Sequence, residues 1–502
     1  MTTVTAFSVC SRFLSFIFKI YISRALGAEI VGLYQICISV LILLLSLTAG
    51  GLPNVLSRKI AEAEVKGNYK RQNSLMAQSL LIGLTASAIV IIVLYSLGDK
   101  LSIIFADDRC VDMFLIMLPA VLTSTLYALI RSWFWGRKKF LAFSFTEFLD
   151  SIFKIAFSAF FISGIISSIS GAIGISIAFI LADVLCVLIL FILYFANGGR
   201  LAKPTGFLEL EKSAIPITTT HIAGSAVNSL TAIVIPAQLV LIGMTTPQAT
   251  AEYGRLAGMA LPLLMAPSSL IGSLAVVLTP EIASYATQGD NKALLNKLES
   301  SLAFCVFITS MFLAVYAPLG KNLGVLFFGD EMAGVYVSQC CLLILPIGIN
   351  QVASTVVNSL GMENKCLLHF LIGIAILLPC IFFLPRVIGI YAMPVGSMLS
   401  NSVLTILNMR SLRKKLGQPI HTWKKSLLLL LFALPSAALT YFLQGILTHF
   451  LPTVLVIILA GGAGVGIFVT LSSVFKVVQI GSFIANKFHL PLKKKSAVAN
   501  KA

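Results

Sequence analysis

The sequence predicts an all-α integral membrane protein with about 14 transmembrane helices, arranged as two parallel-repeat six-helix lobes around a central cavity plus two extra helices. The composition is 58% hydrophobic and only 11% charged, with a mean hydropathy of +0.98. Most of such a backbone must lie in lipid, where only helices and closed barrels satisfy every peptide group. The apolar runs are unbroken over roughly 20 residues, which favours helices over the alternating strands of a barrel.

Charged residues and Gly/Pro clusters separate the apolar runs and set the predicted spans. The predicted spans are 4–24, 31–56, 75–98, 112–134, 141–163, 169–196, 213–241, 253–280, 299–318, 333–359, 366–385, 387–409, 426–446 and 452–475. The first of them carries charge within its apolar run and lacks a small-residue cleavage site after it, so a cleavable signal peptide is not expected.

An internal repeat supports the two-lobe arrangement. A shift of 222 positions aligns Gly32 with Gly254, Gly50 with Gly272 and Asp108 with Asp330, and the register continues over about a hundred residues. The shift corresponds to six spans, so the halves share one orientation and are expected to enclose a cavity near the midplane. The predicted domains are 1–198 (N-terminal lobe), 211–412 (C-terminal lobe), 424–478 (two extra helices) and 479–502 (a basic cytoplasmic tail).

The loops alternate in positive charge along the chain. Lys and Arg are concentrated in every second loop and in the tail, at 58–71, 131–139, 200–212, 292–297, 365, 410–425 and 476–501. The opposite loops carry only Arg24, Lys100, Arg109, Arg255, Lys321 and Arg386. Because the cation-rich side of a membrane protein is cytoplasmic, we predict a multi-pass protein of the cell membrane with both termini in the cytoplasm.

Composition and motifs exclude several classes of function. The net charge of +17 would suggest nucleic acid in a soluble chain, but here it reflects topology, and no nucleic-acid partner is expected. The nine cysteines have no CxxC spacing and are interpreted as buried apolar residues. Neither a metal-ligand spacing nor a phosphate loop is found. We therefore predict no enzyme activity, no catalytic residue, no metal and no cofactor.

The first span carries two cations where lipid does not tolerate them. Arg12 and Lys19 are seven residues apart, on one helix face and about 10 Å apart along the axis. A cation at the bilayer centre costs about 2.5–3.5 kcal/mol. We therefore predict that both line a cavity and attract an anionic headgroup, with snorkelling of Arg12 to the interface as the alternative. Arg24 lies at the outer end of the span, where an interfacial position or a role at the outer mouth is expected.

The fifth span carries charges of both signs on one face. Glu147, Asp150 and Lys154 lie at i, i+3 and i+7 and are predicted to tune the cavity charge or to bind a coupling cation. An ion pair between Asp150 and Lys154, four residues apart, is the alternative. Asp183, in the sixth predicted span, is the other buried acid. It is expected to pair with a cation of the first or the fifth span.

The second half offers neutral polar groups and helix breaks. Its polar candidates for the cavity wall are Thr218, His221, Ser225, Asn228, Asn350, Gln351 and Asn358, for which interhelical hydrogen bonds are the alternative. The predicted gating residues are Gly50, Gly51 and Pro53 in the second span and Pro262 and Pro267 in the eighth. Proline kinks a helix, which suits a segment that bends during gating, although kinks also occur without gating.

Five short motifs point to a known family. The motifs are Arg24-Ala25-Leu26-Gly27-Ala28-Glu29, Gly32-Leu33-Tyr34-Gln35, Gly51-Leu52-Pro53-Asn54-Val55-Leu56-Ser57-Arg58, Arg131-Ser132-Trp133-Phe134-Trp135-Gly136 and Leu261-Pro262-Leu263-Leu264 with Pro267. Together they resemble the stage V sporulation protein B family, which belongs with polysaccharide and lipid-linked oligosaccharide exporters, lipid II flippases and multidrug and toxin extruders. Ser11-Arg12 matches a Ser-Arg pair of the first helix in lipid II flippases. A second arginine of that helix falls at about Phe18, beside Lys19, which puts lipid II itself in doubt as the substrate.

The resemblance implies a flippase that moves a lipid-linked glycan or peptidoglycan precursor outward by alternating access, with spore cortex formation as one expected setting. The predicted substrate-binding residues are Arg12, Lys19, Arg24, Asn54, Glu147, Asp150, Lys154 and Arg255. The expected partners are a lipid-linked anionic glycan, membrane lipids and a coupling cation, and the chain is expected to be a monomer. The alternatives are a cation-coupled multidrug exporter of the same fold and a membrane scaffold for cell-wall enzymes.

Overall fold

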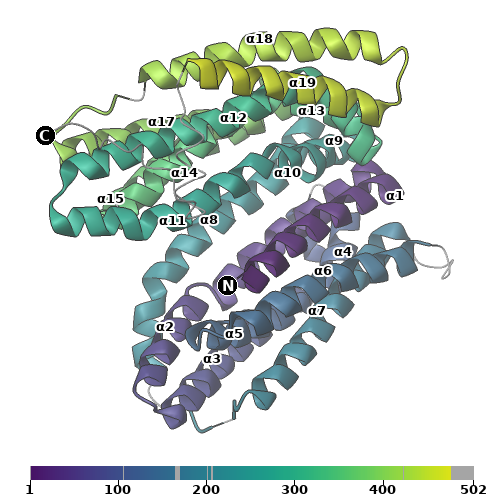
Figure 1. The fold of residues 1–502 in the computed structure, drawn as a ribbon. Coiled ribbons are helices and arrows are strands. Elements are labelled where there is room, and N and C mark those ends of the chain that lie inside the picture. Colours follow the sequence, from purple (N-terminus) through teal and green to yellow (C-terminus); the bar gives the residue numbers. More distant parts are fainter. Residues whose placement is uncertain are drawn as a thin grey trace, which may run out of the picture. The chain divides into compact units, whose positions relative to one another are not determined.

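The computed structural model describes residues 2–105, 107–163, 170–200, 202–204, 207–421 and 423–475. Over these residues the secondary structure consists of helices, with no strand (Figure 1). The predicted all-α class is therefore confirmed. The predicted basic tail, 479–502, lies outside the described residues.

The chain divides into two compact units. Unit 1 comprises residues 1–263, 324–336 and 371–400, and unit 2 comprises residues 264–323, 337–370 and 401–502. The predicted domain boundaries near 198–211 and 412–424 stay predictions.

Unit 1 contains the helices of the first half of the chain. They are α1 (Thr2–Thr48), α2 (Leu52–Val65), α3 (Tyr69–Leu97), η1 (Gly98–Ile103), α4 (Arg109–Met117), α5 (Ala120–Gly136), α6 (Phe140–Ile162), α7 (Gly171–Ala196), α8 (Phe207–Leu241), α9 (Thr246–Tyr253) and the π-helix η2 (Gly254–Ala260). The short helices α16 (Pro385–Ile388) and η4 (Gly389–Tyr391) also belong to it.

Unit 2 contains α11 (Ala266–Gln288), η3 (Cys341–Leu343), α14 (Ile344–Ser359), α18 (Trp423–Leu447) and α19 (Thr453–Val474). The chain passes between the units within five further helices. These are α10 (Leu261–Leu264), α12 (Asn291–Phe328), α13 (Glu331–Cys340), α15 (Glu363–Phe383) and α17 (Ala392–Leu416).

Eleven helices of the described part are long and apolar enough to cross a membrane, and the bent pair α4–α5 brings the number to twelve. The predicted number of fourteen spans stays a prediction. Two features of the structure account for the difference between the two numbers. Helix α1 is counted once although it covers two predicted spans. Helix α6 is not counted, because Glu147, Asp150 and Lys154 make it too charged for a test based on composition.

Glycine explains both the break in α1 and its close packing. Gly27 has φ +76°, a left-handed conformation that glycine adopts without strain, and it separates α1 into two helical stretches. Beyond the break, α1 crosses the end of α9 and the start of η2. A Cβ on Gly32 would collide with the carbonyl oxygen of Thr250, and one on Gly254 with that of Ala28. The two glycines aligned by the sequence repeat therefore allow these helices to meet backbone to backbone.

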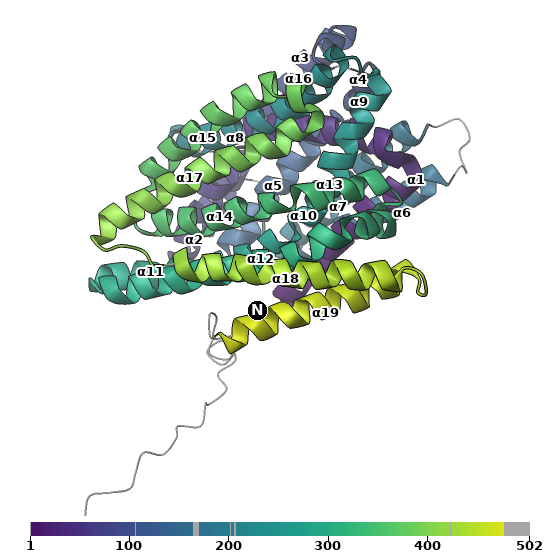
Figure 2. The same ribbon diagram turned by 90° about the horizontal axis from the view of Figure 1, so that it is seen from above.

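Each unit has its own apolar core. In unit 1, α2, α3, α5 and α7 bury a cluster around Trp133 and Tyr194, whose ring centroids are 4.7 Å apart. In unit 2, α11, α12, α14 and α17 share one cluster, and α12, α18 and α19 share another. Helices α18 and α19 lie side by side in both views (Figures 1 and 2), with Gly464 against the side chain of Thr440.

Candidate functional site

The predicted charges of the first half lie on three helices of unit 1, α1, α6 and α7. Helix α6 packs against both α1 and α7. Serines form the contact with α1: the hydroxyls of Ser15 and Ser151 are 3.3 Å apart, and Ser151 also donates to the carbonyl oxygen of Ser11 at 3.4 Å. Small side chains let membrane helices approach closely. The interface thus holds the polar face of α6 beside the charged stretch of α1.

The two α1 cations have no protein partner in the described part of the chain. Arg12 is exposed on unit 1 and Lys19 is partly buried, and the described residues offer neither side chain an ion pair or a hydrogen bond. Four buried polar atoms of α1 and α6 also lack a hydrogen-bond partner there, namely Oδ1 of Asp150 and the hydroxyls of Ser11, Ser144 and Ser158. Such groups are costly within a membrane unless another molecule satisfies them.

The α6 charges are partly paired with each other. Nζ of Lys154 lies 2.7 Å from Oδ2 of Asp150, and the two side chains are 19% and 23% exposed. The ammonium also lies 4.6 Å from the centre of the Phe179 ring on α7. The ion pair expected from the i, i+4 spacing is thus present, whereas Glu147 has no ion pair among the described residues.

Asp183 on α7 finds its partners on α5. Its Oδ2 accepts hydrogen bonds from the hydroxyls of Thr123 at 2.6 Å and Ser124 at 2.8 Å. The carboxylate also interacts electrostatically with Lys154 and Asp150. We did not predict Thr123 and Ser124 as site residues, although two adjacent hydroxyls in an apolar span were an available signal.

Arg24 contacts the end of another helix rather than an acid. Its guanidinium donates to the carbonyl oxygen of Phe327 at 3.0 Å and to those of Val325 and Leu326, in the last turn of α12. Carbonyl groups of the last helical turn carry the negative end of the helix dipole, so a cation stabilises them. The carbonyl oxygen of Val325 also accepts a hydrogen bond from the backbone N–H of Gly329 at 3.1 Å. Arg24 therefore joins the first half of the chain to a segment some 300 residues away.

Arg255 lies in a second cluster of unit 1. Its Nε is 2.8 Å from Oδ2 of Asp330, and its Nη1 is 2.8 Å from Oε1 of Glu252. Tyr336 donates a hydrogen bond to Glu252, and Oδ1 of Asp330 accepts from the backbone N–H of Ala333. The charge of Arg255 is thus matched by two acids that the sequence analysis did not single out.

The predicted helix breaks are located as follows. Helix α1 ends at Thr48 and α2 begins at Leu52, with Pro53 in its first turn, and the backbone N–H of Gly51 donates to the hydroxyl of Thr218 at 2.9 Å. Gly50 has φ +40°. Asn54, in the first turn of α2, is exposed.

In the eighth predicted span, Pro262 lies in α10 and Pro267 in the first turn of α11. The π-helix η2 comes directly before α10, and π-helical turns are frequent at functional sites. The predicted span is therefore divided into three helical pieces.

The polar residues of the second half separate into two groups. On α8, Ser225 shares a 2.7 Å hydrogen bond with Ser46, while His221 and Asn228 are exposed on unit 1. In unit 2, Asn350 donates to Oδ1 of Asn401 at 3.2 Å and accepts from Asn408 at 3.1 Å.

A buried histidine, which the sequence analysis did not single out, extends the unit 2 network. Nδ1 of His369 lies 2.7 Å from Oδ1 of Asn408. Asn358 is exposed, and Oε1 of Gln351 is buried without a hydrogen-bond partner in the described part. Asn350 and Ser225 thus form interhelical hydrogen bonds, the alternative to a place on the cavity wall.

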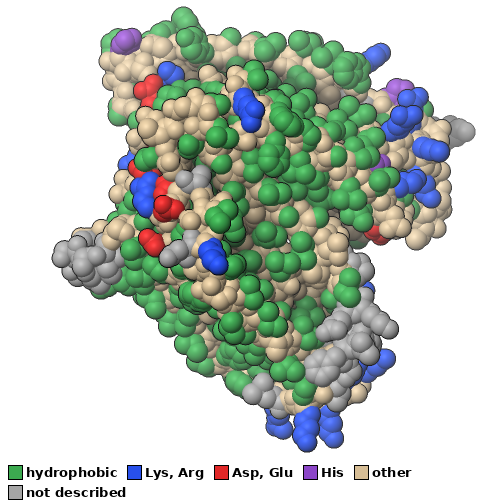
Figure 3. All heavy atoms as spheres, turned by 180° about the vertical axis from the view of Figure 1, so that it is seen from behind, with side chains coloured by type: hydrophobic (Ala, Val, Ile, Leu, Met, Phe, Trp, Pro, Cys, Tyr) green, Lys and Arg blue, Asp and Glu red, His purple; other side chains and the backbone are tan. Residues whose placement is uncertain are grey.

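The ends of unit 1 differ in charge. Acids form ion pairs near α4 and α9, where Glu29 and Asp107 contact Arg109 at 2.6 and 2.7 Å, whereas Lys and Arg prevail near α2 and α3. Figure 3 shows red acidic side chains with blue cations directly beside them in one cluster, and further blue cations without red neighbours at the lower end of the view. Unit 1 thus has the charge asymmetry that the loop pattern predicts.

Comparison with known proteins gives the family. The family model described as polysaccharide biosynthesis protein matches residues 2–286, more than half of the chain. The chain belongs to the polysaccharide biosynthesis protein family. This member is 24% identical over 393 residues to stage V sporulation protein B of Bacillus subtilis (strain 168), with 76% of each chain covered.

Solved structures show the fold of this family member. It matches the lipid II flippase MurJ in an inward closed conformation with a TM-score of 0.68 and 15% identity, over 95% of this chain and 99% of that chain. It also matches an inward-facing multidrug resistance MATE family transporter of the MOP superfamily, with a TM-score of 0.69 and 14% identity, over 81% and 94% of the two chains. With the apolar helices, these matches establish a multi-pass membrane protein with a MurJ- and MATE-like fold.

Proposed function

We propose that this polysaccharide biosynthesis family member is a flippase that moves a lipid-linked glycan or peptidoglycan precursor outward across the cytoplasmic membrane by alternating access. The observation that carries the proposal is the pair of cations on α1, Arg12 and Lys19, which have no partner in the described part of the protein. An anionic diphosphate headgroup would satisfy both charges while its lipid tail stays in the bilayer. The similarity to stage V sporulation protein B supports a role in spore cortex formation.

The multidrug exporter is the second candidate, and the MATE match favours it. A cationic drug or a coupling cation would need acids that are free to bind it. In unit 1, Asp150 is paired with Lys154, and Asp183 accepts two hydroxyl hydrogen bonds. Glu147 is the acid of this face without an ion pair in the described residues, so it is the best candidate for a coupling cation. This arrangement supports the flippase more than the exporter.

Transport by the purified protein tests the proposal. We expect vesicles containing the full chain to expose a fluorescent lipid-linked diphosphate sugar to an impermeant quencher faster than protein-free vesicles do. A neutral lipid-linked sugar serves as the control and should not be moved faster. Efflux of cationic dyes without movement of the diphosphate lipid would contradict the flippase and support the exporter. Activity in neither assay would favour the scaffold.

The second part of the proposal concerns topology: both termini lie in the cytoplasm. We also propose that the protein is a monomer. The excess of cations near α2 and α3 supports this orientation of unit 1. In a background without the nine native cysteines, we expect Lys66→Cys to react with an impermeant maleimide only from the cytoplasmic side. Asp108→Cys should react only from the outside, and both positions are exposed. The reverse labelling would contradict the orientation.

A further inference from the structure

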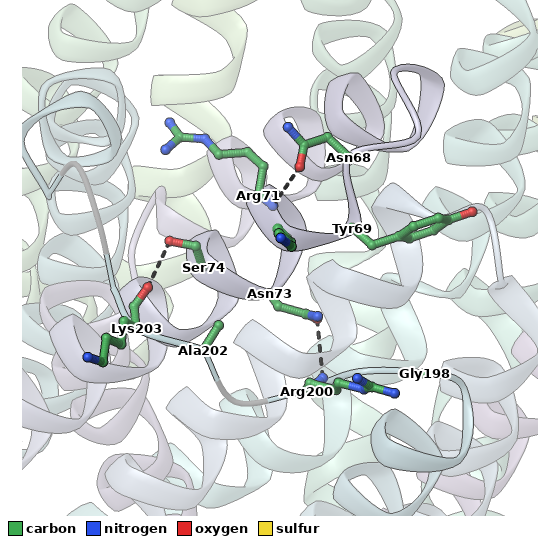
Figure 4. Close-up of a pocket in the computed structure, with 10 residues that line it drawn as sticks. Asn68, Tyr69, Arg71, Asn73, Ser74, Gly198, Arg200, Ala202 and Lys203 are labelled. Atoms are coloured by element: carbon green, nitrogen blue, oxygen red, sulfur yellow. Dashed lines mark hydrogen bonds between the residues drawn. The ribbon is translucent and has the colours of Figure 1, made fainter.

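A basic surface pocket of unit 1 is lined by none of the charged residues of α1 and α6. It has a volume of about 890 Å³ and is formed by the start of α3 and by the segment that follows α7 (Figure 4). We call it the α3 pocket, and its lining residues are Asn68, Tyr69, Lys70, Arg71, Asn73, Ser74, Gly198, Arg200, Ala202 and Lys203.

The lining of the α3 pocket is strongly basic. Its ten residues include four cations and no acid. The side chains of Lys70, Arg200 and Lys203 are exposed and have no ion pair or hydrogen bond to the part of the protein that the structure describes. A nearby acid, Glu64, is already engaged, because its Oε2 contacts Arg137 at 3.1 Å and accepts from Gln72 at 2.6 Å. The positive charge of Lys70, Arg200 and Lys203 is therefore available to a ligand.

Neutral side chains hold the two segments of the α3 pocket together. Asn73 accepts a hydrogen bond from the backbone N–H of Arg200 at 3.2 Å, and the hydroxyl of Ser74 donates to the carbonyl oxygen of Lys203 at 3.0 Å. Figure 4 shows both bonds running from α3 to the segment after α7. These bonds use only the backbone of Arg200 and Lys203. The side chains of both cations can therefore be substituted without removing the hydrogen bonds that hold the segment on α3.

The position along α3 places the pocket at headgroup depth. Helix α3 is a candidate membrane span whose apolar stretch is mostly exposed on the structure, as expected of a helix that faces lipid. The pocket residues 68–74 come directly before that stretch. Tyr69 is 57% exposed, and tyrosine is enriched where a span meets the headgroups. At this depth the pocket lies among the phosphates of lipid headgroups, which favours a lipid over a soluble phosphate as its ligand.

We propose that the α3 pocket binds the phosphate headgroup of an anionic phospholipid such as phosphatidylglycerol. Basic pockets beside membrane helices recognise anionic headgroups in this way. The site differs from the proposed transport site in its residues and its ligand, because it uses Lys70, Arg200 and Lys203 and takes a bulk lipid that is not transported.

A tryptophan placed in the pocket tests the proposal directly. Tyr69→Trp puts a fluorophore at the lining, and its emission is taken as the difference from the parent protein. The full chain is reconstituted in phosphatidylcholine vesicles containing a minority of dibrominated phosphatidylglycerol or dibrominated phosphatidylcholine. We expect the anionic lipid to quench as if it were enriched about tenfold at this position, since each cation at headgroup depth strengthens its binding severalfold.

Matched variants separate the pocket from general surface charge. In the Tyr69→Trp background, Lys70→Gln, Arg200→Gln and Lys203→Gln together should abolish the preference for phosphatidylglycerol. The control Arg58→Gln, Lys66→Gln and Lys414→Gln removes the same charge from exposed positions outside the pocket and should keep it. The charge-retaining set Lys70→Arg, Arg200→Lys and Lys203→Arg should also keep it, which guards against misfolding.

Three results would overturn the proposal. Equal quenching by both brominated lipids, or a preference that survives the pocket variant, would show that the pocket does not select anionic lipid. Relief of the quenching by millimolar inorganic phosphate, but not by chloride at equal ionic strength, would assign the site to soluble phosphate instead of a headgroup.

Discussion

Replacing Arg12 and Lys19 together by glutamine is expected to lower the rate of lipid-linked diphosphate translocation by about 100-fold, because each lost charge-assisted hydrogen bond weakens headgroup binding by about tenfold. Neither side chain has a partner in the described residues, so the fold should not depend on their charge. The measurement is the quencher assay on purified variants whose helicity and elution volume match those of the parent.

Conservative and distant variants show whether charge at these positions is what matters. Exchanging the cations, as Arg12→Lys with Lys19→Arg, should keep most of the translocation rate. The control Arg58→Gln with Lys66→Gln removes equal charge from exposed positions of α2 and the turn after it and should leave the rate unchanged. A parental rate in the Arg12→Gln, Lys19→Gln variant would exclude these cations as headgroup ligands.

Local spacing accounts for contacts within a single helix, including the ion pair that was expected as the alternative to a role in the cavity. The Asp150–Lys154 pair follows from residues four apart on α6, and the structure places the two side chains 2.7 Å apart. The common face of Arg12 and Lys19 follows from helical geometry in the same way. Fold class was also predictable, because the lipid environment leaves few alternatives for a chain of this composition.

The spacing of residues along the chain does not predict contacts between distant segments. Arg24 meets carbonyl oxygens of residues 325–327, which present backbone groups that no side-chain pattern reveals. Asp183 meets hydroxyls 59 and 60 residues earlier in the chain. The repeat aligned Gly32 with Gly254, yet alignment alone did not predict that they would meet at a helix crossing. Such pairings depend on how whole helices pack.

Replacing Lys154 by methionine is expected to destabilise the protein by about 3 kcal/mol, because it leaves the carboxylate of Asp150 uncompensated in a partly buried membrane site. Oδ1 of Asp150 already lacks a hydrogen-bond partner in the described part, and Asp183 adds a second negative charge nearby. The measurement is the midpoint of denaturant-induced unfolding in detergent micelles. The control Lys139→Met, whose ammonium contacts the neutral Oδ1 of Asn197 at 2.8 Å, removes one hydrogen bond and leaves no unpaired charge, so it should cost less, about 1.5 kcal/mol.

The double variant Lys154→Met with Asp150→Asn separates a structural pair from a functional one. Removing both charges should restore most of the lost stability, since no uncompensated ion of the pair remains. If the pair also tunes the charge around Arg12 and Lys19, the stable double variant will still translocate the diphosphate lipid more slowly than the parent. A double variant that is stable and fully active would assign Asp150 and Lys154 to the fold alone, leaving the two α1 cations as the charges that bind the substrate.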